Sequence, residues 1–64
     1  MENIFYIVAV RVDRQWLQVT DIEPVTLEAS KMAYRFPTNE DAQDCAAIFN
    51  EAIVIASTQN EDRQ

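Results

Sequence analysis

Residues 4–12, IFYIVAVRV, decide the expected fold of this chain. The even positions of this stretch are all apolar, and the odd positions are apolar until Arg11. Alternation with a period of two is typical of a β-strand. A strand that is apolar on both faces is favoured at the centre of a sheet, so we expect 4–12 to have a neighbouring strand on each side.

A second strand is predicted at residues 16–22, which would form an antiparallel hairpin with the first. A loop of even length places Val12 opposite Leu17 and keeps the apolar positions of both strands on one face. Because the chain has no glycine, a two-residue turn on residues 14–15 would be strained. We therefore predict a four-residue loop in which Asp13 begins a type I turn.

The segment after the hairpin has two interpretations. Pro24 cannot donate to a sheet ladder, so the second strand should end by about Glu23. Beyond it, alternation over 31–36 favours a strand, whereas Thr26 as an N-cap favours a short helix over 27–34.

A helix is predicted over residues 39–50, with Thr38 as its N-cap. Its buried stripe has the spacing i, i+3, i+4 and i+7 and consists of Ala42, Cys45, Ala46 and Phe49. The β-branched run 53–55 favours a strand at 52–57, although one helix over 39–58 is the alternative. In the absence of glycine, Asn50 and Asn60 are the expected positions for positive φ.

Together these patterns predict a small α+β domain over residues 1–58, followed by a polar tail at 59–64. Its sheet would have three antiparallel strands, formed by the N-terminal hairpin and the C-terminal strand, and the amphipathic helix would pack on one face. The alternative is a three-stranded meander with 31–36 as its third strand and one long C-terminal helix.

The composition excludes most enzyme classes. The chain has 64 residues, of which 11 are acidic and 5 basic, with one cysteine, no histidine and no glycine. A thiol nucleophile or a serine triad needs a base that histidine usually supplies, and phosphate-binding loops need glycine. Cys45 is expected to be a core residue. We therefore predict a protein that is not an enzyme and has no cofactor and no metal.

The charge is concentrated in the second half of the chain. Residues 36–62 contain six acidic residues and no basic one. This balance opposes direct binding to nucleic acid or to an anionic membrane, because both require clusters of Lys and Arg. The apolar run 4–10 is too short to span a bilayer and no basic residue precedes it, so we expect a cytoplasmic protein.

The order of these elements resembles small uncharacterised proteins of bacteriophages and prophages. The resemblance is carried by the hairpin, by Thr26-Leu27, by residues 33–38 (AYRFPT), by residues 40–42 (EDA) and by the β-branched end. It implies an accessory role in the bacterial host cytosol, and it favours the short helix over 27–34 and the final strand. It assigns no site residue.

The leading functional hypothesis is a non-enzymatic, acidic protein-binding module. Carboxylates spaced along a rigid helix can imitate phosphates and occupy a basic groove. Together with the phage origin that the resemblance implies, this predicts a phage-encoded, anti-defence inhibitor of a host nucleic-acid-binding or defence protein. A solvated helix face has the same pattern. The candidate partner-binding residues are Glu40, Asp41, Asp44, Glu51 and the exposed Ile48.

The alternative hypothesis is a homodimeric structural or assembly protein. Because one helix covers only one face of the sheet, Phe5 and Ile7 on the second face are candidates for self-association. Coverage of this face by Met32, Tyr34 or Phe36 would remove that role. Trp16 and Tyr34 are expected to be packing residues.

Overall fold

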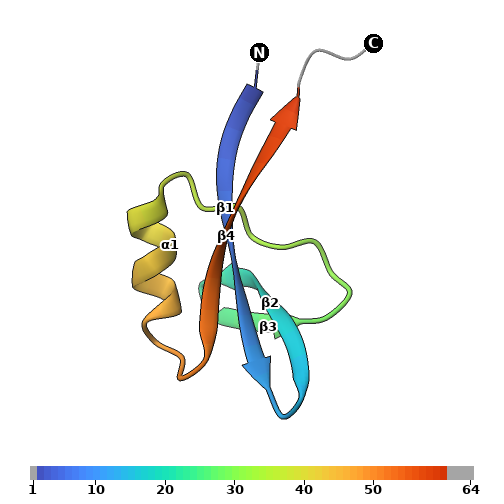
Figure 1. The fold of residues 1–64 in the computed structure, drawn as a ribbon. Helices are drawn as coiled ribbons and strands as arrows, with labels where there is room; N and C mark the ends of the chain where they lie inside the picture. Colours follow the sequence, from blue (N-terminus) through green and yellow to red (C-terminus); the bar gives the residue numbers. More distant parts are fainter. Residues whose placement is uncertain (1, 61–64) are drawn as a thin grey trace.

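The computed structural model describes residues 2–60, in which four β-strands and one helix form a small α+β fold (Figure 1). The elements are β1 (Glu2–Val12), β2 (Gln15–Ile22), β3 (Val25–Glu28), α1 (Asn39–Ala46) and β4 (Ala52–Asn60). The strands form one antiparallel sheet in the order β3-β2-β1-β4. The α+β class is confirmed, but the predicted number of strands is wrong, because the sheet has a fourth strand.

Strand β1 lies at the centre of the sheet, as its two apolar faces predicted. It pairs with β4 along residues 2–10 and with β2 along residues 9–12. The predicted C-terminal strand is therefore confirmed, and the alternative with a helix over 39–58 is wrong. The β-branched run 53–55 pairs directly with Ile7, Val8 and Ala9, so sheet pairing prevails over the helical spacing at this point.

The hairpin between β1 and β2 has a tighter turn than the sequence predicted. Val12 pairs with Gln15, and Val10 with Leu17, so the loop contains only Asp13 and Arg14. The prediction of an even number of loop residues is confirmed, but the predicted length of four residues and the pairing of Val12 with Leu17 are wrong. Asp13 and Arg14 have φ values of 59° and 114°, the sign that a type I′ turn requires.

Replacing Arg14 by glycine is expected to stabilise the fold by about 0.5–1 kcal/mol, because a side chain at positive φ is strained and glycine is not. This gain is net of the larger conformational freedom of glycine in the unfolded chain. Urea unfolding followed by circular dichroism would measure it. Arg14→Ala, which keeps the Cβ atom, should give no comparable gain, and an unchanged or lower stability of Arg14→Gly would contradict the expectation.

Strand β3 is the element that the sequence did not predict. Strand β2 ends at Ile22, in agreement with the expected effect of Pro24, but the chain then turns at once and returns as β3. The peptide between Glu23 and Pro24 is cis. The short helix over 27–34 and the full strand over 31–36 are both wrong, although Phe36 forms an isolated antiparallel bridge with Tyr6.

Helix α1 begins as predicted and ends earlier. The Thr38 hydroxyl accepts a hydrogen bond of 3.1 Å from the Asp41 amide, which makes Thr38 the N-cap. The predicted end at residue 50 is wrong: the helix ends at Ala46, and the amides of Ile48 and Phe49 donate to carbonyls three residues back. Asn50 is not among the described residues that have positive φ, so that prediction is also wrong.

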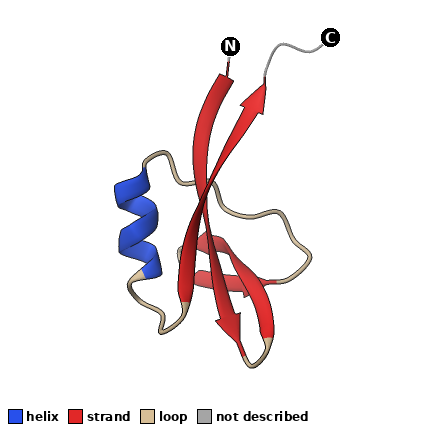
Figure 2. Ribbon diagram, viewed as in Figure 1, coloured by secondary structure: helices blue, strands red, loops and turns tan. Residues whose placement is uncertain are grey.

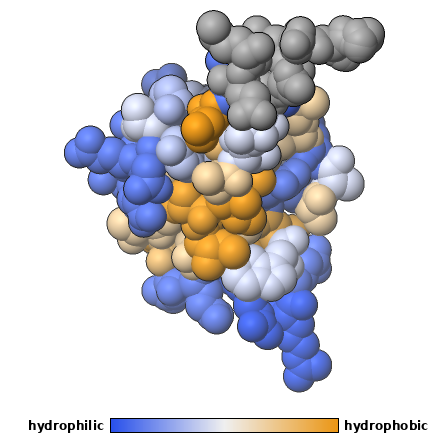
Figure 3. Space-filling view, turned by 45° about the horizontal axis from the view of Figure 1, so that its top comes forward, coloured by the Kyte–Doolittle hydropathy of each residue, from blue (hydrophilic) through white to orange (hydrophobic). Residues whose placement is uncertain are grey.

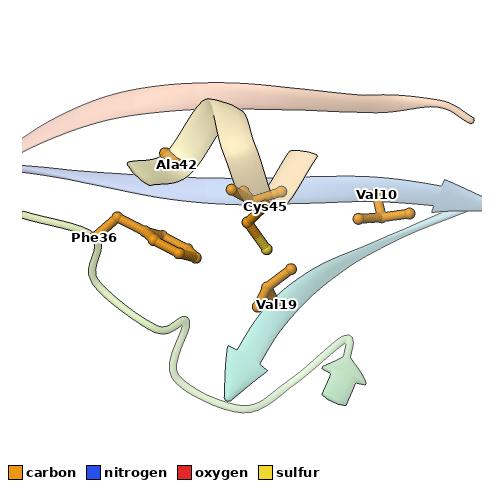
Figure 4. Packing of buried hydrophobic residues seen from close by; sticks show 6 residues of the cluster. Val10, Val19, Phe36, Ala42 and Cys45 are labelled. Atoms are coloured by element: carbon orange, nitrogen blue, oxygen red, sulfur yellow. The ribbon is translucent and has the colours of Figure 1, made fainter. Parts of the chain in front are cut away.

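The hydrophobic core lies between helix α1 and one face of the sheet (Figure 2). Figure 4 shows that the Cys45 side chain points from α1 toward Val19 of β2, with the Phe36 ring beside it. Burial of the predicted helix stripe is confirmed for Ala42 and Cys45, and partly buried Ala46 and Phe49 pack against the core. The buried residues are Val8, Val10, Val19, Phe36, Ala42 and Cys45.

The C-terminal strand is longer than the sequence predicted. Strand β4 continues through Gln59 and Asn60, which were assigned to a polar tail, and pairs them with the start of β1. The rest of that predicted tail, residues 61–64, lies outside the described residues. The described part of the chain contains no helix with the length and apolar character needed to cross a lipid bilayer.

Candidate functional site

A cleft of about 460 Å³ opens between helix α1 and the tip of the β2–β3 hairpin. Such a volume suits one or two side chains of a partner or a small molecule. Three parts of the chain line it: the hairpin tip, the segment that precedes α1, and α1 with the turn that follows. Its lining residues are Ile22, Val25, Tyr34, Phe36, Pro37, Asp41, Asp44, Cys45 and Ile48.

The helix contributes the charged wall of the cleft. Asp41 and Asp44 are one turn apart on α1, so their side chains lie on the same side of the helix. Ile48 follows in the turn after the helix and is 66% exposed, a high value for a large apolar side chain. Three of the five candidate partner-binding residues therefore line one cleft.

The hairpin tip contributes an apolar wall through Ile22 and Val25, which pair with each other across β2 and β3. A β-bulge lies between the pairs formed by Val19 and Asp21. The extra residue reverses the alternation of β2, so that Ile22 lines the same cleft as the helix. Both apolar side chains of the tip are exposed.

The floor of the cleft is formed by buried and half-buried residues. The rings of Tyr34 and Phe36 meet edge to face, with centroids 4.8 Å apart. Burial raises the pKa of the Cys45 thiol, so this group stays protonated and behaves as a small apolar side chain. The floor is therefore an apolar surface without a reactive thiolate.

The acidic face predicted along one helix is not continuous. Because α1 ends at Ala46, Glu51 lies outside the helix, just before β4, where its carbonyl accepts a hydrogen bond from the Arg11 amide. Glu40 is on the exposed surface of α1 but does not line the cleft. The structure thus brings Asp41, Asp44 and Ile48 together, and it separates Glu51 from them.

The second face of the sheet is only partly covered. Phe5 and Ile7 are half-buried, and the Arg35 guanidinium lies 4.4 Å from the centroid of the Phe5 ring, a cation–π contact. The predicted covering residues do not serve this purpose: Met32 is 77% exposed, while Tyr34 and Phe36 pack at the cleft. Trp16 is also exposed, so the expectation that it is a packing residue is wrong.

Sequence reasoning missed the apolar side of the cleft. The sequence pattern indicates packing roles for Tyr34, Phe36 and Cys45, and it assigns no functional role to Ile22 and Val25. One sequence feature indicates this side of the cleft. The β-branched residues Ile22 and Val25 flank Glu23-Pro24, an arrangement typical of a hairpin tip. The bulge that turns them toward the helix has no sequence pattern of its own.

The lining of the cleft combines carboxylates with apolar side chains. Its charged groups are the Asp41 and Asp44 carboxylates, and aliphatic and aromatic side chains form most of the remaining lining. Within residues 2–60, no three side chains of the metal-ligating types gather into a possible metal site. No protein-family model matches the chain, and no curated protein or solved structure shows significant similarity to it.

Proposed function

We propose that this protein is a non-enzymatic binding module whose cleft beside α1 accepts a basic, partly apolar segment of a partner protein. The observation that carries the proposal is the pairing of an apolar floor with the Asp41 and Asp44 carboxylates at its rim. A lysine or arginine of the partner would lie against the carboxylates. A neighbouring apolar side chain would contact Ile22, Val25 and Ile48.

Physical chemistry supports this type of partner. An apolar cleft contributes affinity when it removes apolar surface from water, and rim charges contribute specificity and association rate. The net charge of −6 attracts basic proteins from a distance. More specifically, we propose that this protein is phage-encoded, as the resemblance to phage accessory proteins implies, and that it inhibits a host nucleic-acid-binding or defence protein.

The test is affinity capture from bacterial lysate with three versions of the protein. These are the wild type, the double variant Asp41→Lys/Asp44→Lys, and the control Glu28→Lys/Glu51→Lys, which changes the net charge equally but lies outside the cleft. Captured proteins would be identified by mass spectrometry, and each candidate would then be purified for affinity measurements. We expect the wild type and the control to capture the same basic protein, and the Asp41/Asp44 variant to lose it.

With the purified partner, the Asp41/Asp44 reversal should weaken binding at least ~10-fold, equal to about 1.4 kcal/mol. Raising the salt from roughly 50 mM to roughly 500 mM should weaken the wild-type complex but affect the reversed variant less. Ile48→Ala should weaken binding without changing the salt dependence. Equal losses in the cleft variant and the control would show that net charge alone acts, which would contradict the proposal.

A second candidate function is self-association through the sheet face opposite α1. The observation that favours it is the group of apolar side chains on this face that include Phe5, Ile7, Ile53 and Ile55, of which Ile53 is 49% exposed. Light scattering at micromolar concentration would test it, and a strict monomer would contradict it.

A further inference from the structure

Strand β4 is an edge strand of the sheet. Within residues 2–60, β1 is the only strand that pairs with β4. The Arg11 amide donates a hydrogen bond of 2.9 Å to the Glu51 carbonyl, so these two opposite residues form a hydrogen-bonded pair. In the register of β1 with β4, the odd-numbered residues of β4 therefore bond to β1. Bonded and non-bonded pairs alternate in an antiparallel ladder. The outward-pointing backbone groups therefore belong to Ala52, Val54, Ala56 and Thr58.

The opposite edge of β1 supports this assignment. Tyr6 belongs to the set of β1 residues whose backbone groups point away from β4, and its amide and carbonyl both bond to Phe36, at 2.9 and 2.8 Å. The backbone groups of Tyr6 are therefore paired within the chain. Their counterparts on β4 have no strand beside them among the described residues.

This edge lacks the usual protection against pairing with another chain. Exposed edges are commonly kept short or interrupted by charges, proline or bulges. The other edge strand, β3, has only four residues and ends in Glu28. In contrast, residues 52–58 (AIVIAST) contain no charged residue and no proline, and their register with β1 is unbroken.

The apolar side chains of β4 add to this surface. Ile53 and Ile55 are 49% and 40% exposed, and they pair with Ala9 and Ile7 on the sheet face opposite α1. Figure 3 shows apolar side chains gathered at the centre of one face of the molecule, with hydrophilic residues around them. A second chain along β4 would shield Ile53 and Ile55 from water on the edge side.

We infer that β4 pairs in antiparallel orientation with β4 of a second copy, about a twofold axis at Ile55. In this register Val54 lies opposite Ala56, and Ala52 opposite Thr58, so all four outward-pointing residues exchange hydrogen bonds. A register shifted by one residue would leave these groups unpaired. This pairing rests on the second candidate function, self-association, and specifies its edge and register. It does not depend on the cleft.

The charge distribution favours this edge as the place where two copies meet. Each chain has a net charge of −6, so two copies repel each other wherever their carboxylates face. Over residues 52–58 no carboxylate is present, and the antiparallel register places this uncharged stretch opposite itself. Helix α1 contacts β1 and β4, but its Asp41 and Asp44 line the cleft with the tip of the β2–β3 hairpin, on the side of the sheet opposite β4. No lining residue of the cleft belongs to β4.

The edge can be tested by a proline that removes one outward donor. Ala56→Pro removes an amide that does not bond to β1, and proline is tolerated at such edge positions, so the monomer should fold. The control Ala56→Ser keeps the amide. Sedimentation velocity from about 1 μM to about 1 mM should show a concentration-dependent dimer for the wild type and the control, and a monomer for Ala56→Pro.

Amide hydrogen exchange of the wild type tests the same edge without any variant. The amides of Val54 and Ala56 should exchange more slowly as the concentration rises, whereas those of Ile53 and Ile55 should be protected at every concentration. A wild type of 7.4 kDa over the whole range would overturn both the edge pairing and the self-association candidate. A dimer that survives in a folded Ala56→Pro, or edge amides that do not respond, would overturn the edge pairing alone.

Discussion

Replacing Phe36 by alanine is expected to leave most of the chain unfolded at room temperature. Phe36 is buried in the core with Val8, Val19, Ala42 and Cys45. Truncating a buried phenylalanine costs about 3–5 kcal/mol, and the core of a domain this small rarely contributes more than about 3–5 kcal/mol of net stability. The two quantities are similar in size, so one substitution removes most of the stability.

Urea unfolding followed by far-ultraviolet circular dichroism would measure this effect. Phe36→Leu keeps most of the apolar volume and should cost far less than the alanine variant. Met32→Ala truncates a large side chain that is 77% exposed in the same loop, and it should change the stability by less than about 0.5 kcal/mol. A cooperative Phe36→Ala fold with nearly wild-type stability would show that Phe36 is not central to the core.

Enlarging Ala42 to leucine is expected to destabilise the fold by about 1–3 kcal/mol, although leucine favours helices almost as strongly as alanine. Ala42 is completely buried, and α1 contacts both β1 and β4. A larger side chain here forces the helix away from the sheet. The same displacement would alter the cleft, because Asp41 and Asp44 lie on either side of Ala42 in α1.

Gln43→Leu is the matched control for this prediction. It introduces the same side chain at the next position of α1, where the residue is exposed, and should change the stability by less than about 0.5 kcal/mol. Thermal unfolding of both variants would separate burial from helix propensity. Equal stability of the two leucine variants would mean that the space between α1 and the sheet is not closely filled at Ala42.

Local sequence patterns predicted the elements of this fold that rest on short-range chemistry. The apolar period of two over 4–12 identified the central strand, and the β-branched run 53–55 identified the C-terminal strand. Thr38 and the acidic residues after it located the start of the helix. In each case, a few neighbouring residues contain the whole signal, because side-chain spacing and capping act over one or two turns.

The sequence predictions were wrong where the local structure depends on residues far away in the chain or on strained backbone angles. The turn on Asp13 and Arg14 accepts two residues at positive φ, because the sheet pairing on either side compensates for their strain. Helix α1 ends at Ala46 although no glycine or proline follows it, and the residues from Ala52 onward pair with β1 instead of continuing the helix. Each of these features reflects a competition that no local pattern resolves.

The amino-acid pattern alone predicts the α+β class, the central position of β1, the helix N-cap and the concentration of negative charge in the second half of the chain. Which side chains share a surface depends on the folded chain. The bulge in β2 brings Ile22 to the cleft that Asp41 and Asp44 border, and the early end of α1 removes Glu51 from that surface. The physical reason is that a one-residue change in register reverses every later side chain, and its energy is set by long-range packing.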